Sequence, residues 1–133
     1  MLFRSAYSPV GRGWLTGTFT SPDQFDKDDF RSTQPRFTGE NFEHNAELAD
    51  NVRKVASEIG CTPAQAALAW LLAQGDDILP IPGTKRVAYL EENSAAADIQ
   101  LTSDQVDRLS AAVPQNQVAG DRYAPGGMAT VGH

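Results

Sequence analysis

The sequence contains a single cysteine, and none of its apolar runs is long. Because Cys61 has no partner cysteine in the chain, an internal disulfide is excluded, which fits a reducing compartment. We expect Cys61 to be a small buried apolar residue rather than a nucleophile. No apolar run approaches the roughly 20 residues that span a bilayer. Nor does a basic and then apolar leader open the sequence. These absences predict a cytoplasmic protein.

Positive charge is also scarce, with 11 Lys and Arg against 17 Asp and Glu, for a net charge of −6. This balance argues against non-specific binding to nucleic acid or to an anionic membrane. The acids gather only at Asp23, Asp26, Asp28 and Asp29. That cluster lacks the loop glycine and distal glutamate of a calcium-binding EF-hand. We therefore expect a solvated loop and no metal site.

The most informative stretch is Ile78–Arg86, in which an apolar run meets a Pro-Gly break and ends on Thr84, Lys85 and Arg86. A strand that opens onto a helix N-terminus attracts anions through backbone N–H groups and the helix dipole. Two added cations suit a phosphate. An ordinary strand-to-helix turn with two solvated cations fits the same residues, so both interpretations stay open here.

Four segments have helical signals. Leu48, Val52, Val55 and Ile59 share one face of a helix over residues 45–59. A capping box at Thr62-Pro63-Ala64-Gln65 opens a second helix, whose residues 66–73 are apolar nearly all round and should be buried on more than one side. Residues 87–97 predict a third helix. A second capping box at Thr102 opens a fourth, which Pro114 ends.

The remaining segments set the order of the elements. Residues 2–8 predict a short strand, residues 16–41 a long loop of the kind that is usually functional or disordered, and residues 115–133 a tail that is loose unless something ties it down. Two strands separated by helices imply a parallel pair with a crossover. Such a pair needs cover on both faces. The sequence is therefore α/β and looks like part of a larger structure.

Four motifs, in order along the chain, carry a family resemblance. Ala6–Gly17 reads A-Y-S-P-V-G-R-G-W-L-T-G and closely resembles the Y-S-P-L-G-R-G-F-L-T-G segment around strand seven of the aldo-keto reductases. Phe30–Phe42 is similar to the loop that follows, and Thr62–Trp70 to the next helix. Asp77–Asn93 matches the eighth strand and its helix. The resemblance runs from about residue 3 to residue 113.

The resemblance implies a fold in which this chain is the C-terminal part of an eight-stranded (β/α)8 TIM barrel. It would supply strands seven and eight with their helices and a C-terminal extension. The implied organisation is a partial NADP-dependent oxidoreductase domain over residues 1–133, with a cofactor-side loop at 16–41 and a flexible tail at 115–133. The family's catalytic Asp, Tyr, Lys and His lie on earlier strands, and neither His44 nor His133 replaces them. No catalytic residue is therefore expected here.

The part of the family's active site that this chain would retain is a binding site for NADP(H). The resemblance places Tyr7 against the nicotinamide ring, although packing at a strand end would also explain this residue. Other positions fall where the family contacts the pyrophosphate, the 2′-phosphate, or the adenine and ribose. The implied cofactor-binding residues are Tyr7, Ser8, Pro9, Val10, Arg12, Arg31, Gly83, Thr84, Lys85, Tyr89, Glu92 and Asn93.

Individual roles differ along that set. Ser8 to Arg12 match a loop over the pyrophosphate, where small residues let the backbone approach. Gly83, Thr84 and Lys85 match the loop at the 2′-phosphate, where a lysine favours NADPH over NADH. Arg31 corresponds to a residue that closes over the cofactor. Thr18 departs from the family, since many relatives carry a lysine that reaches the pyrophosphate.

Two functions follow from these observations. The first is the cofactor-binding segment of an NADPH-dependent reductase of aldehydes or ketones, and this segment is expected to be inactive alone. Its expected partners are the dinucleotide, the carbonyl substrate of the parent enzyme and the missing N-terminal part of the barrel. The second is a non-enzymatic helical module that binds a protein through residues 66–73. A helix-turn-helix form over residues 45–73 is disfavoured, because residues 62–74 carry no cation.

Overall fold

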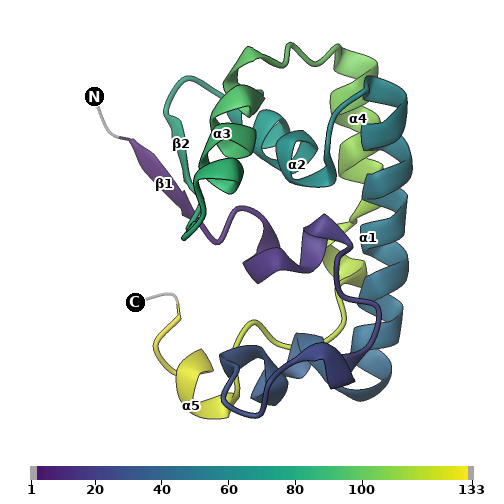
Figure 1. Cartoon of the computed structure of the whole chain (residues 1–133), viewed down its shortest axis with the longest axis vertical. Coiled ribbons are helices and arrows are strands. Elements are labelled where there is room, and N and C mark those ends of the chain that lie inside the picture. The colour runs from purple at the N-terminus through teal and green to yellow at the C-terminus, as the bar shows by residue number, and fades with distance from the viewer. Residues whose placement is uncertain (1–2, 132–133) are drawn as a thin grey trace.

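The computed structural model describes residues 3–131 and contains two short strands that lie beside a set of helices (Figure 1). Leu2, expected to begin the first strand, and His133 lie outside the described residues. The strands and α-helices are β1 (Arg4–Tyr7), α1 (Gly39–Ile59), α2 (Pro63–Leu72), β2 (Ile78–Ile81), α3 (Val87–Ala95), α4 (Ser103–Ala112) and α5 (Pro125–Met128). Short 3₁₀ helices occupy Gly11–Thr16, Pro22–Gln24, Phe30–Thr33, Pro35–Phe37, Ala96–Asp98 and Gln115–Gln117.

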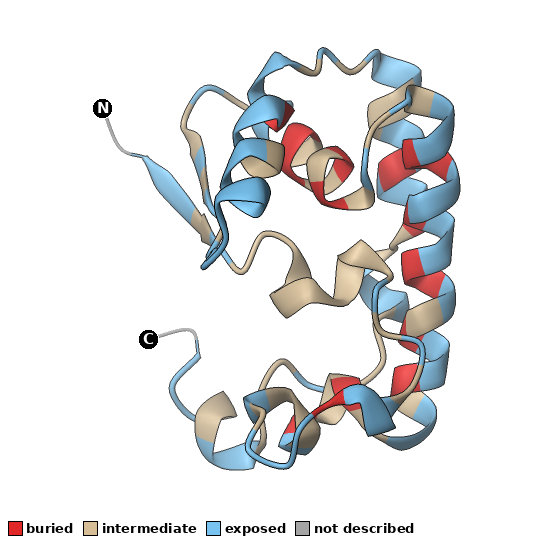
Figure 2. Ribbon diagram, in the orientation of Figure 1, coloured by how far each residue is buried: buried red, intermediate tan, exposed pale blue. Residues whose placement is uncertain are grey.

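The two strands pair in parallel, with Arg4 opposite Ile78 and Tyr7 opposite Ile81. This confirms the parallel pair expected from the order of strands and helices. Side chains alternate between the two faces of a strand. Tyr7 and Ile81 share a face, where they remain 46% and 52% exposed, while β2 also contacts α2. One face of the pair is therefore largely open, and most of β1 is coloured as exposed in Figure 2.

The main core lies where α1, α2 and α4 meet. Its buried members are small or branched apolar side chains: Val52, Val55, Ala56, Ala66, Leu109 and Ala112. Cys61 is half-buried, less than expected, and packs against this cluster, and its partial burial raises the pKa of its thiol. A raised pKa leaves less thiolate at neutral pH, in keeping with the packing role expected from the sequence.

Both predicted capping boxes form. The Thr62 hydroxyl accepts a hydrogen bond from the Gln65 backbone N–H (3.2 Å), and the Gln65 side chain accepts one from the Thr62 N–H (3.1 Å). Thr102 and Gln105 repeat the arrangement at the start of α4 (3.2 and 2.9 Å). Each box pairs backbone donors that a helix N-terminus otherwise leaves without partners.

One helix differs from the sequence-based expectation and another agrees with it. Helix α1 begins at Gly39 instead of residue 45, because Phe42 extends its apolar face into a second cluster with Phe25 and Phe37. Helix α2 is buried on more than one side, as expected, because Ala66 and Leu68 are both buried and the helix contacts α1, α4 and β2. Leu72 at its end is exposed. Among residues 3–131, no helix combines the length and the apolar character that a bilayer span requires.

Candidate functional site

The turn that follows β1 has an uncommon backbone. Gly11, Arg12 and Gly13 all have positive φ (59°, 60° and 88°), a region that disfavours side-chain-bearing residues. Glycine at two of these three positions lowers the cost, and Arg12 takes the same conformation between them. The Gly13 N–H donates to the Val10 carbonyl (3.0 Å). This tight turn puts Arg12 on the wall of a cavity that is also lined by Gly83, which lies in the turn before α3.

The turn between β2 and α3 is open to solvent. Gly83, Thr84, Lys85 and Arg86 are all exposed, and the Thr84 hydroxyl accepts a hydrogen bond from the Arg86 N–H (3.4 Å). A Cβ added to Gly83 would meet nothing within 4 Å. The turn therefore presents a small residue, a hydroxyl and two cations to an incoming group at the N-terminus of α3.

A cavity of about 430 Å³ lies between these two turns and the N-terminus of α2. Seven of the residues predicted from the sequence line it: Val10, Arg12, Arg31, Gly83, Tyr89, Glu92 and Asn93. Five residues outside that predicted set also line it: Gly13, Thr16, Phe19, Pro63 and Ala64. Thr18, noted above as a departure from the family, completes the wall. Two turns far apart in the sequence thus share one hollow.

The remaining predicted residues lie elsewhere. Tyr7, Ser8 and Pro9 line a second cavity of about 640 Å³, together with apolar side chains of α2 and α4. Thr84 and Lys85 are exposed and belong to neither cavity. The predicted set is therefore divided among the 430 Å³ cavity, the 640 Å³ cavity and the open turn.

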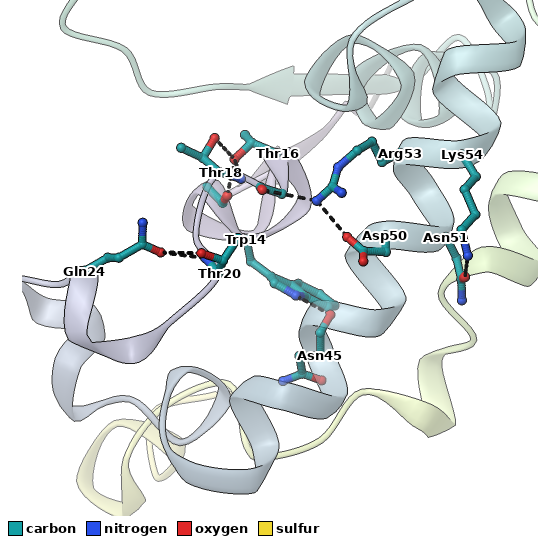
Figure 3. A network of polar contacts seen from close by, with 12 residues as sticks. Trp14, Thr16, Thr18, Thr20, Gln24, Asn45, Asp50, Asn51, Arg53 and Lys54 are labelled. Carbon is teal, nitrogen blue, oxygen red and sulfur yellow. Dashed lines mark hydrogen bonds and ion pairs between the residues drawn. The ribbon is translucent and has the colours of Figure 1, made fainter.

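Several contacts fix the turn after β1 on α1 (Figure 3). The Trp14 indole N–H donates to the Asn45 carbonyl (2.7 Å). Arg53 donates to the Gly17 carbonyl (3.2 Å) and pairs with Asp50 (2.7 Å). Gly17 has a φ of 66°, a left-handed conformation that favours glycine at this position. The long helix thereby holds the wall of the 430 Å³ cavity that includes Thr16 and Thr18.

Arg31 is already paired within its own loop. Its guanidinium donates to both carboxylate oxygens of Asp29 (3.0 and 2.6 Å) and to the Arg12 carbonyl (3.0 Å). Both side chains are about three-quarters buried. The hydrogen bonds from Arg31 hold the pKa of the Asp29 carboxyl below its ordinary value of 3.8. Arg31 thus ties the long loop to the turn after β1, and most of its charge is offset by Asp29.

This pair predicts an acid-range loss of stability. A carboxyl with a lowered native pKa stabilises the fold above the unfolded value and loses that contribution as the pH falls through the native value. We expect the Asp29→Asn variant to lose about 1 kcal/mol at pH 7 and to lack the extra decline below pH 3.8. Urea unfolding between pH 2 and pH 7 measures it. Parallel curves for both proteins would contradict the pairing.

Glu92 joins two helices. Its carboxylate accepts a hydrogen bond from the Thr62 hydroxyl (2.6 Å), and its backbone carbonyl accepts one from the Gln65 side chain (3.1 Å). The family resemblance implied a place for Glu92 at the adenine and ribose, and this contact was not anticipated. The partners lie 30 and 27 residues before Glu92 in the chain, so no local pattern could reveal them.

The Arg12 guanidinium lies between two aromatic rings. It is 5.2 Å from the centre of the Phe30 ring and 4.6 Å from that of the Tyr123 ring, and it donates to the Arg122 carbonyl (3.1 Å). Such stacking orients a guanidinium while its charge persists. Arg122 and Tyr123 were outside the predicted site. They lie in a segment without periodicity, which gives no local signal of such contacts.

Comparison with known proteins places these features in a family. The profile of the Aldo/keto reductase family matches residues 4–114. The chain is 52% identical over 120 residues to the aldo-keto reductase yakc [NADP(+)] of Schizosaccharomyces pombe, which covers 90% of this chain and 35% of that protein. It is 44% identical over 119 residues to the aldo-keto reductase str7 of Strobilurus tenacellus, with the same coverage of 90% and 35%.

A solved structure agrees with the sequence matches. The glycerol dehydrogenase of Gluconobacter oxydans superposes with a TM-score of 0.72 at 30% sequence identity, over 85% of this chain and 36% of that one. The chain thus spans about a third of the length of the proteins that it matches. The match bears out the expected fold class, in which two parallel strands and their helices form the C-terminal part of a (β/α)8 barrel.

Proposed function

The chain belongs to the aldo/keto reductase family, and from that membership we propose that it binds the adenosine and phosphate end of NADP(H). The observation that carries the proposal is the 430 Å³ cavity, which brings Val10 and Arg12 to Gly83, Tyr89 and Asn93 across most of the chain length. One relative carries NADP(+) in its printed name. In the family resemblance, these same positions fall at the pyrophosphate, the 2′-phosphate, and the adenine and ribose.

The charges around this cavity suit a phosphorylated ligand. In a chain of net charge −6, Arg12 lines the cavity, and Lys85 and Arg86 stand exposed at the open turn beside Gly83. Because Asp29 neutralises Arg31, Lys85 is the better partner for the 2′-phosphate that distinguishes NADPH from NADH. Glu92 and Thr62 would then support the adenosine side by fixing α3 on α2.

The catalytic step lies with other parts of the parent enzyme. When bound, the nicotinamide supplies the hydride that reduces an aldehyde or ketone to an alcohol. The residues of this chain bind and orient the cofactor. The tyrosine that protonates the oxygen in the family belongs to an earlier strand, so the 133-residue chain alone is proposed to lack turnover.

The open face of the strand pair supports a further partner. Leu79 and Ile81 are about half exposed, and a parallel strand pair needs cover on both faces. We assign this cover to the N-terminal part of the same barrel, whether it comes from the same chain or from another. A cytosolic location accords with this assignment and with the lone Cys61. The alternative, a helical module that binds a protein through residues 66–73, gains no support from the structure, because Ala66 and Leu68 of α2 are buried in the chain's own core.

Cofactor titration tests the proposal directly. NADPH and NADH are titrated into the full chain while the fluorescence of the nicotinamide and of the tryptophans is followed. We expect NADPH to bind at least about tenfold more tightly than NADH. Equal affinities, or no binding of either, would overturn the proposal. An assay with NADPH and a reactive aldehyde checks the second part, since turnover above background would refute inactivity.

A further inference from the structure

A segment near the C-terminus contacts α1, the long loop and the turn after β1, and is held at several points. We call residues 117–124 the strap. Asn45 on α1 receives a hydrogen bond from the Ala119 N–H (2.9 Å) and donates one to the Ala119 carbonyl (2.9 Å). Arg36 donates to the Gly120 carbonyl (3.2 Å), and His44 bonds to the Gln117 carbonyl (2.7 Å). The segment that the sequence presents as a loose tail has a defined path here.

The strap brings two side chains onto Tyr7. The hydroxyls of Tyr7 and Tyr123 share a hydrogen bond of 3.0 Å. The Arg122 guanidinium lies 5.1 Å from the centre of the Tyr7 ring, and Arg12 stacks on the Tyr123 ring at 4.6 Å. Tyr7 stands at the end of β1 with nearly half of its surface exposed. The strap therefore supplies contacts to both the hydroxyl and the face of this ring.

A tyrosine ring has two rotatable side-chain bonds. A hydrogen bond at its hydroxyl and a cation over its face together select one orientation. An exposed ring without them would sample several rotamers. If Tyr7 receives the nicotinamide ring, its orientation before binding sets part of the binding cost, because an ordered ring loses less freedom when the ligand arrives.

We propose that the strap is a positioning device for the cofactor, in which Tyr123 holds the hydroxyl of Tyr7 and Arg122 covers its ring so that Tyr7 is ordered for the nicotinamide. The proposal rests on the proposed function, that the chain binds NADP(H), and on the position of Tyr7 against the nicotinamide ring that the family resemblance implies. Tyr123 is a positioning residue that acts through Tyr7. The hydrogen bond from Tyr123, followed by that from Arg122, lowers the pKa of Tyr7, which provides a readout that needs no cofactor.

The first arm of the test follows tyrosine ionisation by absorbance near 295 nm in the full chain. The unsubstituted protein should show one ionisation below the ordinary pKa of 10.0. Tyr7→Phe should abolish this early step, and Tyr123→Phe should move it upward. Tyr89→Phe removes a hydroxyl from α3, outside the strap, and should leave the step in place. An unchanged step in Tyr123→Phe would overturn the proposal.

The second arm is a double-mutant cycle on NADPH affinity. Tyr7→Phe and Tyr123→Phe each remove one hydroxyl of the shared hydrogen bond, so each should weaken binding about three- to tenfold. The double variant should be no weaker than either single variant, because the second change removes nothing further. Losses that multiply would show that Tyr123 acts by another route and would overturn the strap's role. NADPH binding absent from the unsubstituted chain would instead count against the proposed function, while the ionisation arm still tests the contact.

Discussion

Replacing Lys85 with methionine is expected to weaken NADPH binding about tenfold and to leave NADH binding within about twofold. Lys85 lies in the exposed turn between β2 and α3. It follows Gly83 by two residues, and Gly83 lines the 430 Å³ cavity. Its ammonium group can pair with the 2′-phosphate, which only NADPH carries. Lys85→Glu puts a negative charge in the same place, so it should lower the NADPH affinity further.

A second lysine provides the control for this prediction. Lys54 is exposed on α1, where its ammonium approaches the Asn51 side-chain oxygen at 3.5 Å. The Lys54→Met variant changes the net charge by the same amount outside the candidate site. It should leave both affinities unchanged at physiological salt, where the screening length is about 8 Å. If Lys54→Met and Lys85→Met weakened NADPH equally, the effect would come from overall charge, and the 2′-phosphate contact would be refuted.

The parts of the fold that follow local rules could be read from the sequence. The boxes at Thr62 and Thr102 each involve residues three positions apart, and such contacts depend on side chains within one turn. The parallel pairing of Arg4–Tyr7 with Ile78–Ile81 followed from the order of strands and helices. Resemblance to a family then supplied the fold class and most of the residues that line the 430 Å³ cavity.

Long-range contacts could not be predicted in the same way. Arg12 stacks on Tyr123, and Tyr7 bonds to the same residue, although more than a hundred residues separate each pair. The strap has no periodic pattern in its sequence. Its path is set by the distant groups that bind it, so the sequence does not reveal that path. The division of the predicted site residues has a similar cause, since Tyr7 lines the 640 Å³ cavity with residues of α2 and α4 while Arg12 lines the 430 Å³ cavity with residues of α3.

Asn45 is the residue on which this path most depends. It is 1% exposed, and its side chain donates to the carbonyls of Arg36 (3.0 Å) and Ala119 (2.9 Å) and accepts from the Ala119 N–H (2.9 Å). In a buried position, a polar group without a partner costs about 1–3 kcal/mol. One asparagine therefore joins α1, the long loop and the strap. A buried asparagine within a helical pattern has no signature that tells it from a solvated one.

Asn45→Ala is accordingly expected to lower the free energy of unfolding by about 2–4 kcal/mol, because it leaves three backbone groups without their partner. Urea unfolding followed by tryptophan fluorescence measures the loss, since Trp14 bonds to the Asn45 carbonyl (2.7 Å). Asn51→Ala, an exposed asparagine on the same helix, is the matched control and should cost less than about 0.5 kcal/mol. The strap also orders Tyr7 in our proposal, so the folded Asn45→Ala protein should bind NADPH at least as weakly as Tyr123→Phe does. Equal stability losses at the two asparagines would show that the buried contacts of Asn45 do not hold the strap.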